Sequence, residues 1–168
     1  VRAMVELNDG QLHRAVEHAA KAVALSRAYK DDLALLHSLL QLQLAAAGLD
    51  DYPQMLAVSR EMEPLAVRAE NARYLALAYV GQGAAQLSLG EYEASAAILK
   101  KAHACLPQEL GPVPESVILG LLASACRHMN QFERATELAS HALDAVLRAR
   151  WSLEPLRHPL VCLLGRQA

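Results

Sequence analysis

Seven histidines and three cysteines are the side chains of this 168-residue chain best suited to metal binding or catalysis. Two side chains on a helix share a face when they lie three or four residues apart. Three short-range pairs miss that spacing: Cys126 and His128, His103 and Cys105, His13 and His18. We therefore predict no metal site and no catalytic residue, and we interpret the histidines as surface or packing residues and the cysteines as reduced thiols.

A phosphate-binding loop is also not indicated. Its one candidate, Gly81-Gln82-Gly83, lacks a third glycine and lies within an apolar helical pattern that no strand precedes. Close packing between helices explains these glycines better. Serine, histidine and aspartate residues occur only as unconnected positions, so we predict that the chain is not an enzyme and binds no cofactor.

The composition is that of a folded domain without a basic surface. Hydrophobic residues make up 54% and charged residues 20%, and the net charge is −2 with a pI near 6.4, so nucleic acid binding is not expected. Apolar stretches such as residues 33–47 contain His37, Gln41 and Gln43 and fall short of the roughly 20 apolar residues of a membrane span. We predict a cytoplasmic location without membrane association. Because Val1 falls inside a helical pattern, we also predict a fragment of a larger protein.

Four turn-like strings recur at intervals of forty residues: Gly10-Gln11-Leu12, Asp50-Asp51-Tyr52, Gly90-Glu91-Tyr92 and Asn130-Gln131-Phe132. Each ends in a large apolar side chain, and mostly small residues follow it at helical spacing. A fixed period of this length is typical of stacked helical hairpins, in which a bulky wedge fills the elbow and small residues allow close approach. We predict second helices over 10–25, 50–65, 90–105 and 130–145.

The segments before these turns predict longer first helices, over 32–47, 69–89 and 114–129, with residues 1–8 as the end of another. Asp31 or Asp32, and Asp50 or Asp51, are candidate N-caps. Pro64 is expected to end or kink its helix, and Pro155 and Pro159 to break the pattern after Trp151. We predict a repeat array over 1–150, a connector over 106–114, and a capping or linker segment over 151–168.

This pattern resembles the tetratricopeptide repeat, which places a glycine-like residue at the turn, an aromatic residue two positions later and small residues beyond. The matching residues are Gly90, Tyr92, Ser95, Ala102 and Pro107, and then Asn130, Phe132, Ala135 and Ala142. The resemblance implies an all-α fold, a right-handed α-solenoid of about four antiparallel helical hairpins. The period of forty departs from the family's usual thirty-four, and Tyr79 is the only trace of the aromatic signature of the first helices.

In that family the first helices line a concave groove, which implies a partner site on them. The candidate groove residues are His37, Leu40, Leu44, Leu77, Val80, Ala84, Leu87, Val117, Gly120, Ser124 and Arg127. Only Arg127 suits a carboxylate clamp, so the expected partner of this apolar groove is a peptide or an amphipathic helix, or else a hydrophobic small molecule. The alternative is that neighbouring helices cover these side chains.

We therefore predict a non-catalytic module for protein–protein interaction. Two alternatives remain open. The longer, Ala- and Leu-rich repeats also resemble sensor segments of bacterial LuxR-type and maltose-regulator-like transcription activators, which implies a small-molecule inducer as the ligand. An exposed end over 151–164 could instead make the chain a self-association module that forms a homo-oligomer.

Overall fold

The computed structural model describes Ala3 and residues 11–164, with side chains described up to Ala149. In this part of the chain the fold is all-α and contains no strand. The elements are α2 (Leu12–Tyr29), α3 (Asp32–Gly48), α4 (Tyr52–Arg68), α5 (Ala72–Ser88), α6 (Tyr92–Cys105), the short 3₁₀ turn η1 (Gln108–Leu110), α7 (Pro112–His128) and α8 (Phe132–Leu164). The helix expected over 1–8 lies outside the described residues, apart from Ala3.

The helices start at a fixed interval. From α2 to α8, each begins twenty residues after the one before it, so the forty-residue period of the sequence consists of two equal halves. The predicted second helices correspond to α2, α4, α6 and α8, and the predicted first helices to α3, α5 and α7. Most predicted bounds agree to within three residues, but α2 continues to Tyr29 and α8 to Leu164.

Five of the turns share one geometry. In each, one residue takes a left-handed conformation with φ between 49° and 83°: Lys30, Asp50, Glu70, Gly90 and Asn130. The N–H of the following residue donates to a carbonyl five positions back, over 2.8–3.1 Å. The N–H of the left-handed residue itself donates to a carbonyl three positions back. This is the Schellman motif, which satisfies carbonyls that the helix end leaves free. The left-handed conformation predicted for Gly90 is confirmed, whereas Gly10 lies outside the described residues.

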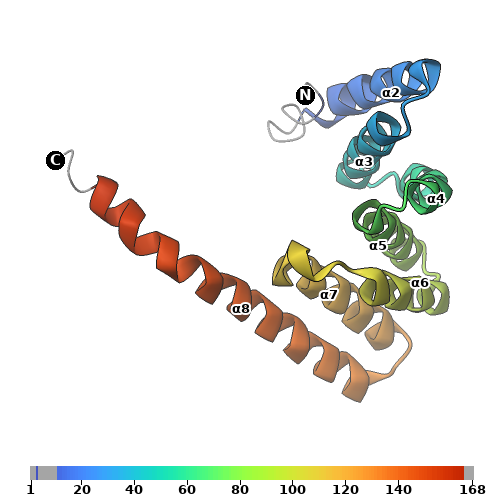
Figure 1. Ribbon diagram of the computed structural model, residues 1–168. Coiled ribbons are helices and arrows are strands. Elements are labelled where there is room, and N and C mark those ends of the chain that lie inside the picture. The colour runs from blue at the N-terminus through green and yellow to red at the C-terminus, as the bar shows by residue number, and fades with distance from the viewer. Residues whose placement is uncertain (1–2, 4–10, 165–168) are drawn as a thin grey trace.

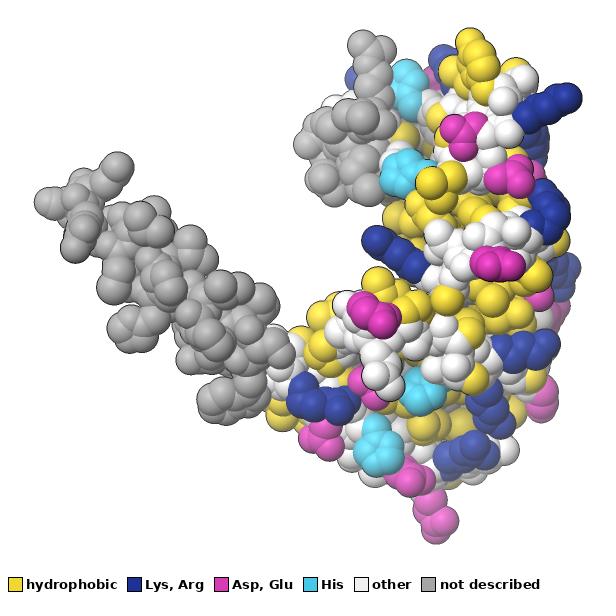
Figure 2. Space-filling view, viewed as in Figure 1, with side chains coloured by type: hydrophobic (Ala, Val, Ile, Leu, Met, Phe, Trp, Pro, Cys, Tyr) yellow, Lys and Arg dark blue, Asp and Glu magenta, His cyan; other side chains and the backbone are white. Residues whose placement is uncertain are grey.

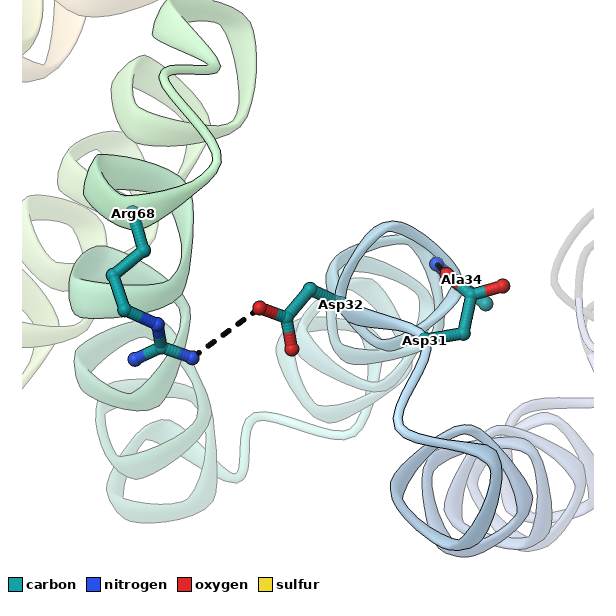
Figure 3. A network of polar contacts seen from close by, with 4 residues as sticks. All are labelled: Asp31, Asp32, Ala34 and Arg68. Atoms are coloured by element: carbon teal, nitrogen blue, oxygen red, sulfur yellow. Dashed lines mark hydrogen bonds and ion pairs between the residues drawn. The ribbon is translucent and has the colours of Figure 1, made fainter.

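Side-chain caps start three of the helices. The Asp31 carboxylate accepts from the N–H of Ala34 over 2.9 Å, at the start of α3 (Figure 3). The Asp51 and Asn71 side chains accept in the same way at α4 and α5. The sequence left two N-cap candidates for α3 and two for α4. The structure shows that Asp31 caps α3 and Asp51 caps α4.

Asp32 makes a different contact. Its carboxylate lies 3.4 Å from the Arg68 guanidinium and ties the start of α3 to the end of α4 (Figure 3). Both side chains are more than half exposed, so we expect this pair to contribute at most about 1 kcal/mol.

The helices form two layers. Consecutive helices pack against each other, and further contacts join α3 to α5 and α5 to α7. Among the described residues no contact joins α2 to α4, α4 to α6 or α6 to α8. The stack therefore curves toward α3, α5 and α7, which we call the inner layer, and α2, α4, α6 and α8 form the outer layer (Figure 1).

Three of the four wedge side chains occupy equivalent surroundings, whereas the fourth, Phe132, is 61% exposed. Leu12 lies against Gly48, Tyr52 lies near Ser88, and the Tyr92 ring stacks on His128 with centroids 4.5 Å apart. Each partner is 36 residues further along the chain, at the end of the next inner helix. Successive helices therefore nest in the same way along the stack.

The core is a strip of clusters that follows the stack. Leu36, Leu39 and Met62 are fully buried between α2, α3 and α4, and Leu99 and Ile118 are fully buried between α6 and α7. A smaller cluster of Met55, Leu56 and two alanines links α3, α4 and α5. Each helix thus buries its face only against its neighbours, as repeat arrays do.

Gly81 and Gly83 lie inside this packing, as the sequence indicates. Both are buried in α5, and a Cβ atom on Gly83 would collide with the Leu99 side chain. A Cβ on Gly81 would meet Gln43 and Ser59. These glycines therefore allow α4 and α6 to approach α5 closely.

The connection between α6 and α7 differs from the five repeated turns. Pro107 disfavours helical geometry at Leu106, which is extended, so α6 ends after 14 residues where α3, α4, α5 and α7 have 17. The chain then forms η1 and turns at Gly111, whose φ of 74° and ψ of −173° favour glycine. The predicted connector is confirmed in position, but α7 begins earlier than expected, with Pro112 in its first turn.

Of the two outcomes expected at Pro64, a helix end or a kink, the structure contradicts the end. Pro64 does not end α4, which continues to Arg68. The residues after Pro64 include Leu65 and Ala66, which are buried in the core, and this packing holds the last turn although one backbone hydrogen bond is lost.

The helical pattern also does not break at Pro155 and Pro159. α8 runs through both positions to Leu164, and its C-terminal half extends beyond α7 (Figure 1). The predicted boundary at residue 150 therefore falls within a single helix.

Candidate functional site on the inner layer

The eleven candidate groove residues all lie on the inner layer. Three of them, His37, Leu40 and Leu44, lie on α3, and the rest are spread over α5 and α7, so the set forms a band across three adjacent helices. The contacts of α5 with α3 and with α7 keep this band continuous.

None of these eleven side chains is buried. His37, Leu44, Val117, Gly120 and Arg127 are exposed, and the other six are partly buried. Leu44 and Val117 keep 44% and 49% of their surface accessible, a considerable exposure for apolar residues. The alternative that neighbouring helices cover the band therefore holds only in part, for the sides of Leu40, Val80 and Leu87 that touch the core.

The band has different chemistry along its length. Near α3 it is polar: the His37 ring nitrogens lie 2.9 Å from Gln41 Nε2 and 3.3 Å from the Tyr74 hydroxyl. The second of these contacts joins α3 to α5. The middle is apolar, with Leu77, Val80, Ala84 and Leu87 of α5.

On α7 the band becomes open and then charged. Space is free around Gly120, where an added Cβ would meet no atom within 4 Å. Arg127 is exposed in the last turn of α7. An apolar strip with a polar group at either end can orient a bound helix or peptide as well as hold it. Figure 2 shows hydrophobic side chains interleaved with charged and histidine side chains on one face of the molecule.

Sequence reasoning missed two residues that contact His37 beside this band, the partly buried Tyr74 and the buried Gln41. Tyr74 and Gln41 complete the polar end through His37, yet neither occupies a groove position of the repeat pattern. A signal was present: an imidazole and an amide four residues apart share a helix face, and this pair is His37 and Gln41.

A depression separate from this band lies where α6, α7 and α8 meet. It has a volume of about 620 Å³ and lies at the α6–α7 connection against α8, where its polar wall includes His103, Glu115 and Arg148. Arg148 and Glu115 form an ion pair of 2.9 Å that joins α8 to the start of α7.

The remaining candidates for chemistry are separate. Cys126 is buried and His128 is exposed, so these two side chains do not converge. Burial raises the pKa of the Cys105 thiol above its usual value. His158 and Cys162 lie outside the described side chains. Within the described residues, no group of three or more His, Cys, Asp or Glu side chains could hold a metal ion.

No helix in the described part of the chain is long and apolar enough to cross a membrane. No family model, curated protein or solved structure matches this chain.

Proposed function

We propose that this chain is a non-catalytic interaction module, a tetratricopeptide-like right-handed superhelix whose inner layer binds an amphipathic helix or extended peptide. The observation that carries the proposal is the accessible apolar band across α3, α5 and α7. Leu44 and Val117 at its two sides are about half exposed, and burying such side chains against a partner is favourable by about 25 cal/mol per Å².

The polar ends of the band support a partner with a defined direction. The His37–Tyr74 contact presents hydrogen-bonding groups at α3, and Arg127 presents a cation at α7. A partner with an apolar centre and an acidic residue near one end fits this order of groups.

The test uses peptides selected from a displayed random library for binding to the full chain. In one variant, Leu44→Glu and Val117→Glu place two charges in the band. In the matched control, Leu25→Glu and Val67→Glu place the same charges on exposed apolar positions of α2 and α4, in the outer layer. We expect the first variant to weaken binding of the selected peptide at least ~10-fold and the control to leave it within about twofold. Equal loss in both variants, or no loss in the first, would contradict the proposal.

The depression beside the α6–α7 connection favours a second candidate, a ligand-sensing domain of a bacterial transcription regulator. Its volume of about 620 Å³ lies within the usual range of small-molecule sites, and its wall offers both charges of the Arg148–Glu115 pair. A thermal-shift screen of metabolites separates the two functions. A small molecule that raises the melting temperature, and no longer does so in the Glu115→Gln variant, would favour sensing over peptide binding.

A further inference from the structure

The outer helices α2, α4 and α6 each pack one face against the next inner helix. In α4 this face consists of Tyr52, Leu56, Ser59, Glu63 and Ala66, and we call it and its equivalents in the other outer helices the forward face. Every one of these five residues is buried or partly buried. The same holds for the equivalent residues of α2, and for those that follow from Tyr92 in α6 except His103.

Polar contacts confirm which element covers the forward face. Glu63 accepts from Gln82 Nε2 of α5 over 2.8 Å, and the same amide lies 3.5 Å from the Ser59 carbonyl. In α2, the Ser26 hydroxyl lies 3.4 Å from that of Ser38 in α3. The covering element is thus always the next helix along the chain.

The forward face of α8 has no such cover. It consists of Phe132, Thr136, Ala139, Leu143 and Val146, and all five residues are exposed. Phe132 is 61% accessible, Leu143 58% and Val146 50%, although α8 packs its other side closely on α7, where Ala145 is fully buried. A depression of about 450 Å³ also lies beside Phe132.

The three covered faces define the kind of element that fits. Each covering helix runs antiparallel to its outer helix: the wedge at the start of the outer helix meets the end of the covering helix, as Leu12 meets Gly48 and Tyr92 meets His128. The α2 face is the nearest match to α8, since Ala19 and Ala139 are the same residue type and Val23 and Leu143 are both aliphatic. The α8 face carries no charged side chain, so the fitting surface is apolar.

We propose that the forward face of α8 is a second docking site, for an antiparallel α-helix of a partner with the character of α3: apolar, and with a small residue where it meets the Phe132 wedge. Binding there continues the packing already present three times in the chain. The site lies on the outer layer and does not depend on the peptide-binding band of the inner layer.

The probe is a fluorescein-labelled synthetic peptide with the sequence of residues 32–48, which is α3, titrated with the full chain and followed by anisotropy. We expect saturable binding. Ala139→Glu with Leu143→Glu should weaken it at least ~10-fold, because the charges would be buried without a partner. The control, Ser140→Glu with His141→Glu, adds two glutamates at exposed positions of the same helix outside the forward face and should change the affinity less than about twofold.

Circular dichroism establishes that both variants remain folded, which exposed positions should permit. The inner-layer variant Leu44→Glu, Val117→Glu should bind the α3 peptide normally, so failure of the docking site is distinguishable from failure of the proposed function. The proposal is overturned if the α3 peptide does not bind, or binds the forward-face variant as tightly as the unaltered chain. It is also overturned if sedimentation shows a dimer that the forward-face variant dissociates, since a second copy would then be the occupant.

Discussion

The turn between α4 and α5 and the connection between α6 and α7 both join an outer helix to an inner helix, and they use different chemistry. The first is a Schellman turn with Glu70 in a left-handed conformation and an Asn71 cap. The second has a proline, a 3₁₀ turn and Gly111, with no side-chain cap. Both nevertheless place the next helix twenty residues after the previous one. The spacing is therefore maintained by helix packing, and the turn only has to span the gap.

This comparison predicts that buried core residues beside either connection are equally important. Leu36 lies in the cluster near the regular turns, and Leu99 lies between α5, α6 and α7. Leu36→Ala and Leu99→Ala should each lower the free energy of unfolding by about 2–5 kcal/mol, because both side chains are fully buried. Urea unfolding followed by circular dichroism measures this.

The form of the unfolding curve sharpens the comparison. If packing couples the stack across the α6–α7 connection, both alanine variants unfold in one transition. Two separate transitions in Leu99→Ala alone would show that the irregular connection divides the array into independent units.

The two glycines of the turns should differ in sensitivity. Gly111 has a φ and ψ combination that other residues scarcely adopt, so Gly111→Ala should cost about 1–3 kcal/mol. Gly90 lies in the left-handed helical region, and Gly90→Ala should cost roughly 1–2 kcal/mol. Thermal melts of the two variants give the order, and a larger loss at Gly90 would reverse the ranking.

The caps give a smaller effect that is restricted to the regular turns. Asn71→Ala removes the acceptor for the Tyr74 N–H, and we expect a loss of about 1 kcal/mol. Glu91 at the start of α6 makes no cap bond and accepts only an exposed hydrogen bond from Gln86 over 3.3 Å, so Glu91→Ala serves as the control and should lower the midpoint of denaturation less than Asn71→Ala does.

Glu70→Gly should have the opposite sign. The left-handed conformation of Glu70 costs about 1–2 kcal/mol, and glycine removes that cost but loses about 0.5–1 kcal/mol of chain entropy on folding. A net stabilisation of up to ~1 kcal/mol is expected in denaturant titrations. Destabilisation would mean that the Glu70 side chain contributes a contact that outweighs its strained backbone.

The loss of folding stability at high pH should show the smallest effect. Burial, and then the nearby Glu63 carboxylate, raise the pKa of Tyr79 above the usual tyrosine value of 10.0. The folded chain therefore holds this proton where the unfolded chain has lost it, so this contribution to stability is complete below pH 10 and falls as the pH rises through the folded pKa. Tyr79→Phe should flatten the fall in melting temperature above pH 10, and an unchanged slope would exclude this source.

Sequence reasoning identified the hairpins because their wedges are large and their turn residues polar or glycine. Tyr52, Tyr92 and Leu12 occupy the equivalent positions that their forty-residue spacing predicts. The twenty-residue half-period escaped notice because Lys30 and Glu70 are not the residues that usually mark a left-handed turn.

The helix ends were harder to place for a physical reason. Pro64 has a strong local tendency to stop a helix, but burial of Leu65 and Ala66 outweighs it, and that burial depends on helices far along the chain. The inner-layer residues could be located from the repeat, and their accessibility could not, because exposure of Leu44 and Val117 depends on the curvature of the stack.

The even spacing of the helices has a consequence for how such a chain can grow or shrink. Removing forty residues would return every later helix to its former side, and both faces would keep their composition. Removing twenty would exchange the sides, so that segments suited to the inside of the curve would face outward. Natural length variants of this architecture should therefore differ by pairs of helices.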